Sequence, residues 1–194
     1  YRADLSHDTP TIAEMLKPAG YATYMVGKWH LTINDTADKP KDNWPRQRGF
    51  DRYYGTIKGS GSYYDPVMLV RENTPVSPST DPEYKPEHFY YTDAIADQSA
   101  RYIREHRESQ AGKPFFLTVA YTNPHPPFDA LSQKHLQMYE GVKFDSFNYE
   151  PMARNAARDK EMFKDFLGNV RKTAAATTAL DDQIPVILDK LRQR

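Results

Sequence analysis

The sequence predicts an α/β fold in which helices and strands alternate along the chain. A capped helical pattern near the start is followed directly by a short strand pattern at residues 21–26. A second helical pattern precedes a nearly continuous apolar run at residues 115–121, which is typical of a strand buried on both faces of a parallel sheet. A third helical pattern closes the chain, so the order is helix, strand, helix, strand, helix.

The first helix is signalled by Thr9-Pro10, which places a capping residue before a proline at the first helical position. We expect the helix to bury one apolar face, made of Ile12, Met15 and Leu16. The strand that follows runs straight into Gly27-Lys28-Trp29-His30.

The stretch at about 32–90 is expected to be a loop-rich insertion. Seven prolines and four glycines interrupt residues 32–87, which excludes long helices. A loop of this length inside a compact domain is usually either functional or disordered. Its aromatic residues favour a packed loop: Phe50, Tyr53, Tyr54, Tyr63 and Tyr64.

The second half of the chain returns to regular patterns. Thr92-Asp93 is a good helix cap, and the helix should end before Gly112. The strand at 115–121 ends where prolines at 124, 126 and 127 prevent further pairing. The last segment repeats apolar residues at steps of three and four, and Pro185 should kink or break this helix; the repeating residues are Val170, Ala174, Thr177, Leu180, Ile184, Leu188 and Leu191.

Composition excludes several classes of protein. The 26 basic and 26 acidic residues give zero net charge, so the chain has no long-range field for a nucleic acid. No run approaches the roughly 18 apolar residues that a membrane span needs. The absence of cysteine excludes a disulfide, a thiolate zinc site and a cysteine nucleophile within these residues.

Lys28 and His30 are the first candidates for chemistry. They follow a strand two positions apart, so alternation should place both side chains on one side while Trp29 points into the core. An ammonium and an imidazole at the carboxyl end of a strand suit an anionic substrate. An alternative remains open, in which the two side chains only cap carbonyls at the strand end.

His125 is the second candidate, because flanking prolines fix its backbone at the end of the next strand. Together with Lys28 and His30 it could form an oxyanion site with a general acid or base. It could equally be a turn histidine bonded to a backbone carbonyl. We expect solvated surface positions for the remaining polar candidates, which are His88, His106, His135 and Asp181-Asp182, and a turn position for His7.

An ordered set of motifs resembles the type I sulfatases of the alkaline-phosphatase superfamily. The resemblance covers nearly the whole chain and rests on Thr11-Ile12-Ala13-Glu14-Met15-Leu16-Lys17, Gly20-Tyr21-Ala22-Thr23, Gly27-Lys28-Trp29-His30-Leu31, Arg48-Gly49-Phe50-Asp51-Arg52-Tyr53-Tyr54-Gly55, Tyr91-Thr92-Asp93, Pro114-Phe115-Phe116-Leu117, Asn123-Pro124-His125-Pro126-Pro127 and Leu180-Asp181-Asp182-Gln183. It implies a mixed sheet flanked by helices and an arylsulfatase-like hydrolysis of sulfate monoesters through a formylglycine nucleophile.

The resemblance also implies roles for individual residues. Lys28 would bind the sulfate and the formylglycine hydroxyl, and His30 would act as the base for sulfate elimination. His125 would bind sulfate and help to protonate the leaving oxygen. Ser60 or Ser62 would correspond to a serine that assists in some members, and Ser60 is the choice for substrate binding.

The family motif that carries the nucleophile and the calcium ligands has no counterpart in these residues. The resemblance therefore implies that residues 1–194 are the central portion of a single large N-terminal sulfatase domain, inactive alone, with exposed apolar surface and marginal stability. Calcium and the formylglycine modification would lie outside this fragment, and no metal ligand is expected within it.

Two alternatives remain for the function. One is a phosphomonoester or phosphonate monoester hydrolase of the same superfamily. The other is a non-catalytic sulfate- or glycan-binding module, in which exposed tyrosines between residues 53 and 91 could stack on sugars. The expected partner is a small-molecule or glycan sulfate ester, not a nucleic acid or a membrane, and the family resemblance implies a periplasmic or extracellular location.

Overall fold

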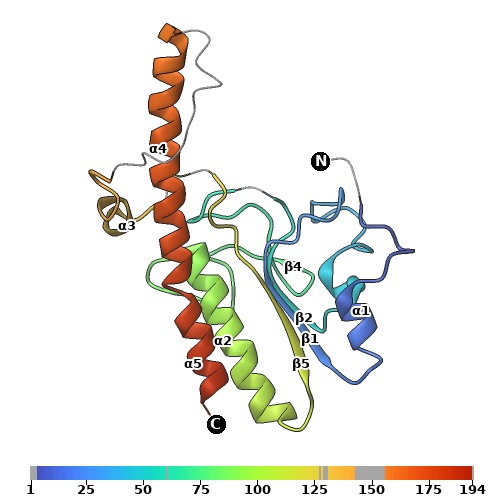
Figure 1. Ribbon diagram of the computed structural model, residues 1–194. Helices are drawn as coiled ribbons and strands as arrows, with labels where there is room; N and C mark the ends of the chain where they lie inside the picture. The colour runs from blue at the N-terminus through green and yellow to red at the C-terminus, as the bar shows by residue number, and fades with distance from the viewer. Residues whose placement is uncertain (1–3, 60, 127, 129–130, 143–155, 194) are drawn as a thin grey trace. The chain divides into compact units, whose positions relative to one another are not determined.

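The computed structural model describes residues 4–59, 61–126, 128, 131–142 and 156–193 (Figure 1). The chain divides into two compact units. The first comprises Tyr1–Thr122 and Gln183–Arg194, and the second comprises Asn123–Asp182. The two units are described separately below.

A five-stranded mixed sheet forms the centre of the first unit. Its order is β4 (Thr74–Pro75), β3 (Leu69–Arg71), β2 (Arg52–Thr56), β1 (Ala22–Gly27), β5 (Phe115–Ala120). β1 is parallel to both of its neighbours, whereas β3 is antiparallel to β2 and to β4. This mixed sheet confirms the predicted α/β class.

Two glycines at the end of β1 and in β2 leave no room for a side chain. Gly27 pairs with Ala120 in the register of β1 and β5, and its φ of 109° is in the left-handed region that favours glycine. A Cβ at Gly27 would lie 2.0 Å from the Ala120 carbonyl oxygen, and one at Gly55 would lie 1.8 Å from the Gly27 oxygen. Only glycine fits at these two positions.

Helices cover both faces of the sheet (Figure 1). α2 (Tyr91–Gln110) packs on β1 and β5, and α5 (Ile184–Arg192) packs on α2. α1 (Ile12–Leu16) lies on the opposite face, next to the short 3-10 helix η1 (Pro45–Arg48). The core on this side gathers aromatic and aliphatic side chains, including Met25, Trp29, Trp44, Phe50, Tyr53 and Ile57.

The apolar face predicted for α1 was wrong. Ala13 is fully buried, whereas Ile12 and Met15 are 64% and 62% exposed. The cap is Thr11 rather than Thr9, because the Thr11 hydroxyl accepts from the Glu14 N–H and the Glu14 carboxylate accepts from the Thr11 N–H. Glu14 also binds Arg48, so polar contacts set the rotation of this short helix.

The position predicted for the apolar strand at 115–121 was also wrong. β5 lies at the edge of the sheet, and all six of its residues are half-buried. The sequence analysis likewise found no strand in the stretch 32–87, which contributes β2, β3 and β4. Short strands between prolines and glycines leave little periodic signal. In contrast, α2 closely matches the helix predicted to begin near Thr92.

The second unit contains α3 (Gln133–Gln137) and α4 (Ala156–Asp181), which contact each other. Its small core is Leu131, Ala175 and Ala176, with Phe128, Leu136 and Tyr139 packed against it. α4 ends at Asp181 and α5 begins at Ile184, so the break predicted at Pro185 is confirmed.

Several apolar side chains are exposed, as the sequence predicted. On α5, Ile184, Leu188 and Leu191 are 37%, 39% and 45% exposed. Within the described ranges, no helix is long and apolar enough to cross a bilayer.

The lack of room at Gly27 generates a prediction about stability. We expect Gly27→Ala to destabilise the full-length protein by about 3 kcal/mol or more, because the methyl group would clash with Ala120 and the backbone would be strained. Thermal unfolding followed by circular dichroism measures this. Gly112→Ala is the matched control, since its Cβ would meet nothing within 4 Å. Equal unfolding temperatures for the two variants would contradict the prediction.

Candidate active site

The residues that follow β1 continue the hydrogen bonding of the sheet with both neighbouring strands, β5 and β2. The Lys28 N–H donates to the Ala120 carbonyl at 2.8 Å. The next two N–H groups, of Trp29 and His30, donate to the carbonyls of Thr56 and Ile57 at 2.9 and 3.1 Å. Lys28 and His30 therefore lie at the carboxyl ends of three parallel strands, the edge where open α/β sheets bind ligands.

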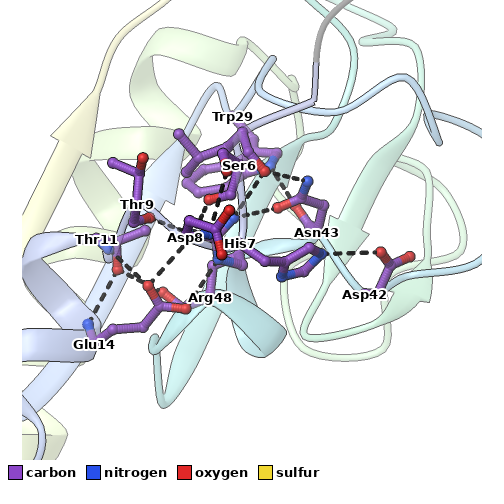
Figure 2. Close-up of polar contacts among 11 residues, drawn as sticks. Ser6, His7, Asp8, Thr9, Thr11, Glu14, Trp29, Asp42, Asn43 and Arg48 are labelled. Atoms are coloured by element: carbon purple, nitrogen blue, oxygen red, sulfur yellow. Dashed lines mark hydrogen bonds and ion pairs between the residues drawn. The ribbon is translucent and has the colours of Figure 1, made fainter.

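Trp29 points into the core, as predicted. Its side chain is nearly buried and meets the ring of Phe50 edge to face at 6.2 Å. The indole Nε1–H donates to the Asn43 carbonyl at 2.9 Å (Figure 2). This anchor fixes the segment between the two candidate side chains.

The strand alternation that was used to place the Lys28 and His30 side chains on one side does not apply to this segment. β1 ends at Gly27, and His30 has a φ of 55°, so this segment is not an extended strand. The imidazole of His30 instead lies against the backbone of Gly59. A Cβ at Gly59 would come within 2.0 to 2.4 Å of the ring atoms Cε1, Nδ1 and Nε2.

Lys28 is a half-buried cation at this edge of the sheet. Among the residues that the structure describes, no carboxylate lies within ion-pair distance of its ammonium. Burial lowers the pKa of Lys28, because desolvation penalises the charged form. An unpaired, partly desolvated ammonium at this edge favours the binding of an anion.

A small pocket lies beside Gly59 in the same unit, lined by Thr56, Gly59, Gly61, Ser62, Tyr63, Pro66, Tyr91 and Thr122. Of the two candidate serines, Ser62 lines this pocket, and its hydroxyl accepts from the Tyr64 N–H at 3.1 Å. Ser60 lies outside the described residues.

His125 belongs to the second unit, at the start of its chain. Its side chain is exposed, and Nδ1 bonds to the Pro126 carbonyl. A carbonyl only accepts, so Nδ1 carries the proton in the neutral ring and Nε2 is the basic nitrogen. This bond is the one expected of a turn histidine, and it also fixes the tautomer that a proton-transfer group needs.

The other histidines differ in their surroundings. The predicted surface position of His106 was wrong: it is 4% exposed, with Nδ1 at 2.8 Å from the Tyr24 hydroxyl and Nε2 at 2.7 Å from the Lys113 carbonyl. His88 is exposed, as predicted, and His7 pairs with Asp42 at the surface. Charged residues flank His106 in the sequence, and this pattern gave no indication that His106 lies on the buried side of α2.

Asp181 and Asp182 are exposed, as predicted. His135, however, is largely covered, because its Nε2 lies 3.0 Å from Asp182 and its Nδ1 lies 2.6 Å from the Ser132 hydroxyl. The hydrogen bond to His135 lowers the pKa of Asp182. These contacts connect α3 to the end of α4.

Calcium prefers a cage of several oxygen ligands. Within the described part of the chain, no three His, Asp or Glu side chains gather to hold a metal ion. These described residues therefore do not fit a calcium site by themselves.

Comparison with known proteins decides the family. A family model described as Sulfatase matches residues 1–194, the whole chain. The chain belongs to the sulfatase family. This sulfatase is 32% identical to mouse arylsulfatase J over 144 residues, 70% of this chain and 22% of that protein. It is 31% identical to an arylsulfatase of Klebsiella aerogenes, over 67% of this chain and 27% of that protein.

Another relative is a putative extracellular sulfatase Sulf-1 homolog of Caenorhabditis elegans, 27% identical over 75% of this chain and 19% of that protein. The sulfatase chain therefore spans about a quarter or less of the length of these three curated relatives.

Solved structures give the same fold. The putative sulfatase yidJ of Bacteroides fragilis superposes with a TM-score of 0.69 at 21% identity, covering 98% of this chain and 41% of that one. Ps i-CgsB in complex with k-i-k-neocarrahexaose superposes with a TM-score of 0.65 at 24% identity, covering 100% of this chain and 38% of that one. The fold is therefore alkaline-phosphatase-like, as the sequence predicted.

Gly59 is the site residue that sequence reasoning missed. It was interpreted only as an interruption of a loop, yet its missing side chain makes room for the His30 imidazole. The sequence signal was the repeated glycine at 59 and 61, in a segment that comes directly after a strand.

The contact between Gly59 and His30 can be tested structurally. We expect Gly59→Ala to displace the His30 ring by about 1 Å or more, because a methyl carbon needs about 3.5 Å from a ring atom. A crystal structure of the variant measures the displacement. A variant in which the ring keeps its place beside residue 59 would refute the described packing.

Proposed function

We propose that the full-length protein containing these residues hydrolyses sulfate monoesters. The observation that carries the proposal is Lys28, a half-buried ammonium without an ion-pair partner among the described residues, beside His30 at the edge where the parallel strands end. A sulfate group would supply the missing negative charge. Membership of the sulfatase family supports sulfate over other anions.

Each of the three candidate side chains receives one task. Lys28 binds a sulfate oxygen and neutralises the charge that develops on it during reaction. His30 would remove a proton from the second hydroxyl of a formylglycine hydrate, so that the C=O bond re-forms, the C–O bond to the enzyme-bound sulfate breaks and sulfate leaves. His125 protonates the oxygen of the departing alcohol when the S–O bond breaks, for which its second ring nitrogen must carry a proton.

The proposed reaction also needs a modified residue and a metal ion, neither of which is among these residues. A formylglycine would supply the hydroxyl nucleophile, and calcium would neutralise sulfate charge. We place both outside residues 1–194, because the family's nucleophile motif has no counterpart in the sequence and the described residues gather no metal ligand set. Residues 1–194 would then form the central portion of one catalytic domain, with a loop-rich insertion at about 32–90, and would be inactive alone.

The substrate class proposed is a small-molecule or glycan sulfate ester, and the proposed location is the periplasm or the cell exterior. The neocarrahexaose bound to Ps i-CgsB and the extracellular assignment in the name of the C. elegans relative support these proposals. The stretch at 32–90, which carries Gly59 and the pocket beside it, would set specificity.

A non-catalytic glycan-binding module is less well supported. It required exposed tyrosines between residues 53 and 91, but most of them are buried in the core. Tyr53, Tyr54, Tyr63 and Tyr91 are at most 2% exposed, and only Tyr64 among the described tyrosines of this stretch is mostly accessible, at 51%. The tyrosines of the insertion hold its fold together.

The assigned roles predict large losses of activity. We expect Lys28→Ala and His125→Ala to lower kcat/KM for an aryl sulfate by about a hundredfold or more, because charge stabilisation and proton transfer each contribute that much. Steady-state kinetics of the full-length protein measures the loss. The matched controls are Lys85→Ala and His88→Ala, both exposed. Unchanged turnover in either site variant would refute its role.

The same kinetics also tests the reaction class. We expect the full-length protein to cleave aryl sulfates faster than aryl phosphates or phosphonate monoesters. The reverse order would support the phosphoester alternative. Turnover of aryl sulfate by the isolated 194-residue chain that depends on His30 would contradict its predicted inactivity.

The lowered pKa of Lys28 predicts that sulfate binding depends on pH. Burial lowers its pKa below the ordinary value of 10.5, so the ammonium loses its proton at a lower pH than a solvated lysine. Affinity for inorganic sulfate should therefore fall as pH rises, with a midpoint below pH 10.5. Isothermal titration calorimetry across alkaline pH measures this. In Lys28→Arg the midpoint should move upwards, and an unmoved midpoint would exclude Lys28 as its origin.

A further inference from the structure

Arg48 is a buried guanidinium whose hydrogen bonds converge from several segments (Figure 2). We propose that Arg48 is a positioning residue for His30, acting through the residues on either side of it. The proposal deepens the function proposed above, because it concerns the placement of the imidazole that moves a proton.

The guanidinium is held by Glu14 and by two main-chain carbonyls of the N-terminal segment. Its side chain is 1% exposed, and its Nε donates to the Glu14 carboxylate at 2.9 Å. One terminal nitrogen, Nη2, donates to the carbonyls of Ser6 and Thr9 at 3.2 and 2.8 Å. The other, Nη1, remains for the two contacts that lead towards His30.

The first arm runs through Asn43 to Trp29. Arg48 Nη1 donates to the Asn43 side-chain oxygen, and the Asn43 main-chain carbonyl accepts from the Trp29 indole at 2.9 Å (Figure 2). Trp29 directly precedes His30. The position of Asn43 therefore determines where the Trp29 indole is held, and with it the backbone that precedes His30.

The second arm runs through Leu5 to Leu31. The Leu5 carbonyl accepts from Arg48 Nη1 at 3.2 Å and from the Asn43 amide at 2.8 Å. The Leu5 N–H donates to the Leu31 carbonyl at 3.0 Å. Leu31 directly follows His30, so both neighbours of the imidazole are connected to one guanidinium.

His30 needs such restraint because its backbone is in an unfavourable conformation. Its φ of 55° is uncommon for a residue with a side chain, and such conformations persist only where their surroundings enforce them. Its N–H bond to Ile57 restrains one side of the residue. The two arms restrain the chain before and after it, which keeps the ring against Gly59.

The test compares Arg48→Lys with the control Arg46→Lys in the full-length protein. Both residues belong to η1, but Arg46 is partly exposed and pairs with Glu72 outside this network. A lysine at 48 keeps the charge but lacks the planar fork that serves several acceptors at once. We expect Arg48→Lys to lower kcat for an aryl sulfate by about tenfold or more, as for a misplaced catalytic group.

Two further readouts separate positioning from general stability. KM should change little in Arg48→Lys, because Lys28 still binds sulfate. The Cε1–H resonance of His30, assigned by its loss in His30→Gln in 13C-histidine-labelled protein, should shift or broaden in Arg48→Lys and stay unchanged in Arg46→Lys.

A folded Arg48→Lys protein with wild-type kcat and an unchanged His30 resonance would overturn the proposal. If Arg48→Lys does not fold, Trp29→Phe decides the question, because it removes the indole bond to Asn43 and keeps an aromatic ring in the core. An unchanged kcat and resonance in this variant also overturn the proposal. A wild-type protein that cleaves no sulfate ester would instead refute the proposed function, while the resonance still reports whether Arg48 positions His30.

Discussion

The guanidinium of Arg48 joins the N-terminal segment, α1 and the loop before η1. Two of these parts also bond to the residues on either side of His30. Burying a charge without a partner is costly, and here Glu14 and several carbonyls compensate for the lost water. The hydrogen bond from Arg48 lowers the pKa of Glu14, so the carboxylate stays ionised in mildly acidic solution. Because Glu14 must face Arg48, α1 turns its apolar residues to the outside.

Many of the opposite charges that balance in the sequence also pair in space. Arg71 and Asp81 form a buried ion pair at 2.7 Å, and Lys17 pairs with Asp51 at 2.7 Å on the surface. Lys28 differs from these cations, because no described carboxylate lies within ion-pair distance of it. A balanced sequence can therefore contain an anion site, provided that one cation is placed where the acidic residues do not reach. The total charge gives no indication of such a site.

Much of the fold could be predicted from local sequence signals. α2 and the break at Pro185 follow from periodicity and the chemistry of proline. Trp29 lies in the core as predicted, although its segment is not an extended strand. The buried face of α1 could not be predicted, because it depends on the distant residue Arg48. The partial burial of β5 could not be predicted either, because it depends on the strand order. The site divides in the same way. Lys28 and His30 were predicted from their place after a strand, whereas Gly59 and Arg48 act through contacts between segments that are distant in sequence.

The contact between Gly27 and Ala120 has a consequence for strand register. β5 is apolar or β-branched at nearly every position, so a slip by one residue would exchange its two faces at little hydrophobic cost. The observed register, from Ala22 opposite Phe115 to Gly27 opposite Ala120, brings a carbonyl to within 2.0 Å of the place of a Cβ at Gly27. A residue with a side chain could not take the left-handed backbone of Gly27 at this place, so the observed pairing depends on a glycine at the end of β1. In this sheet a missing side chain lets the backbone leave the extended conformation of β1 just before Lys28 and His30.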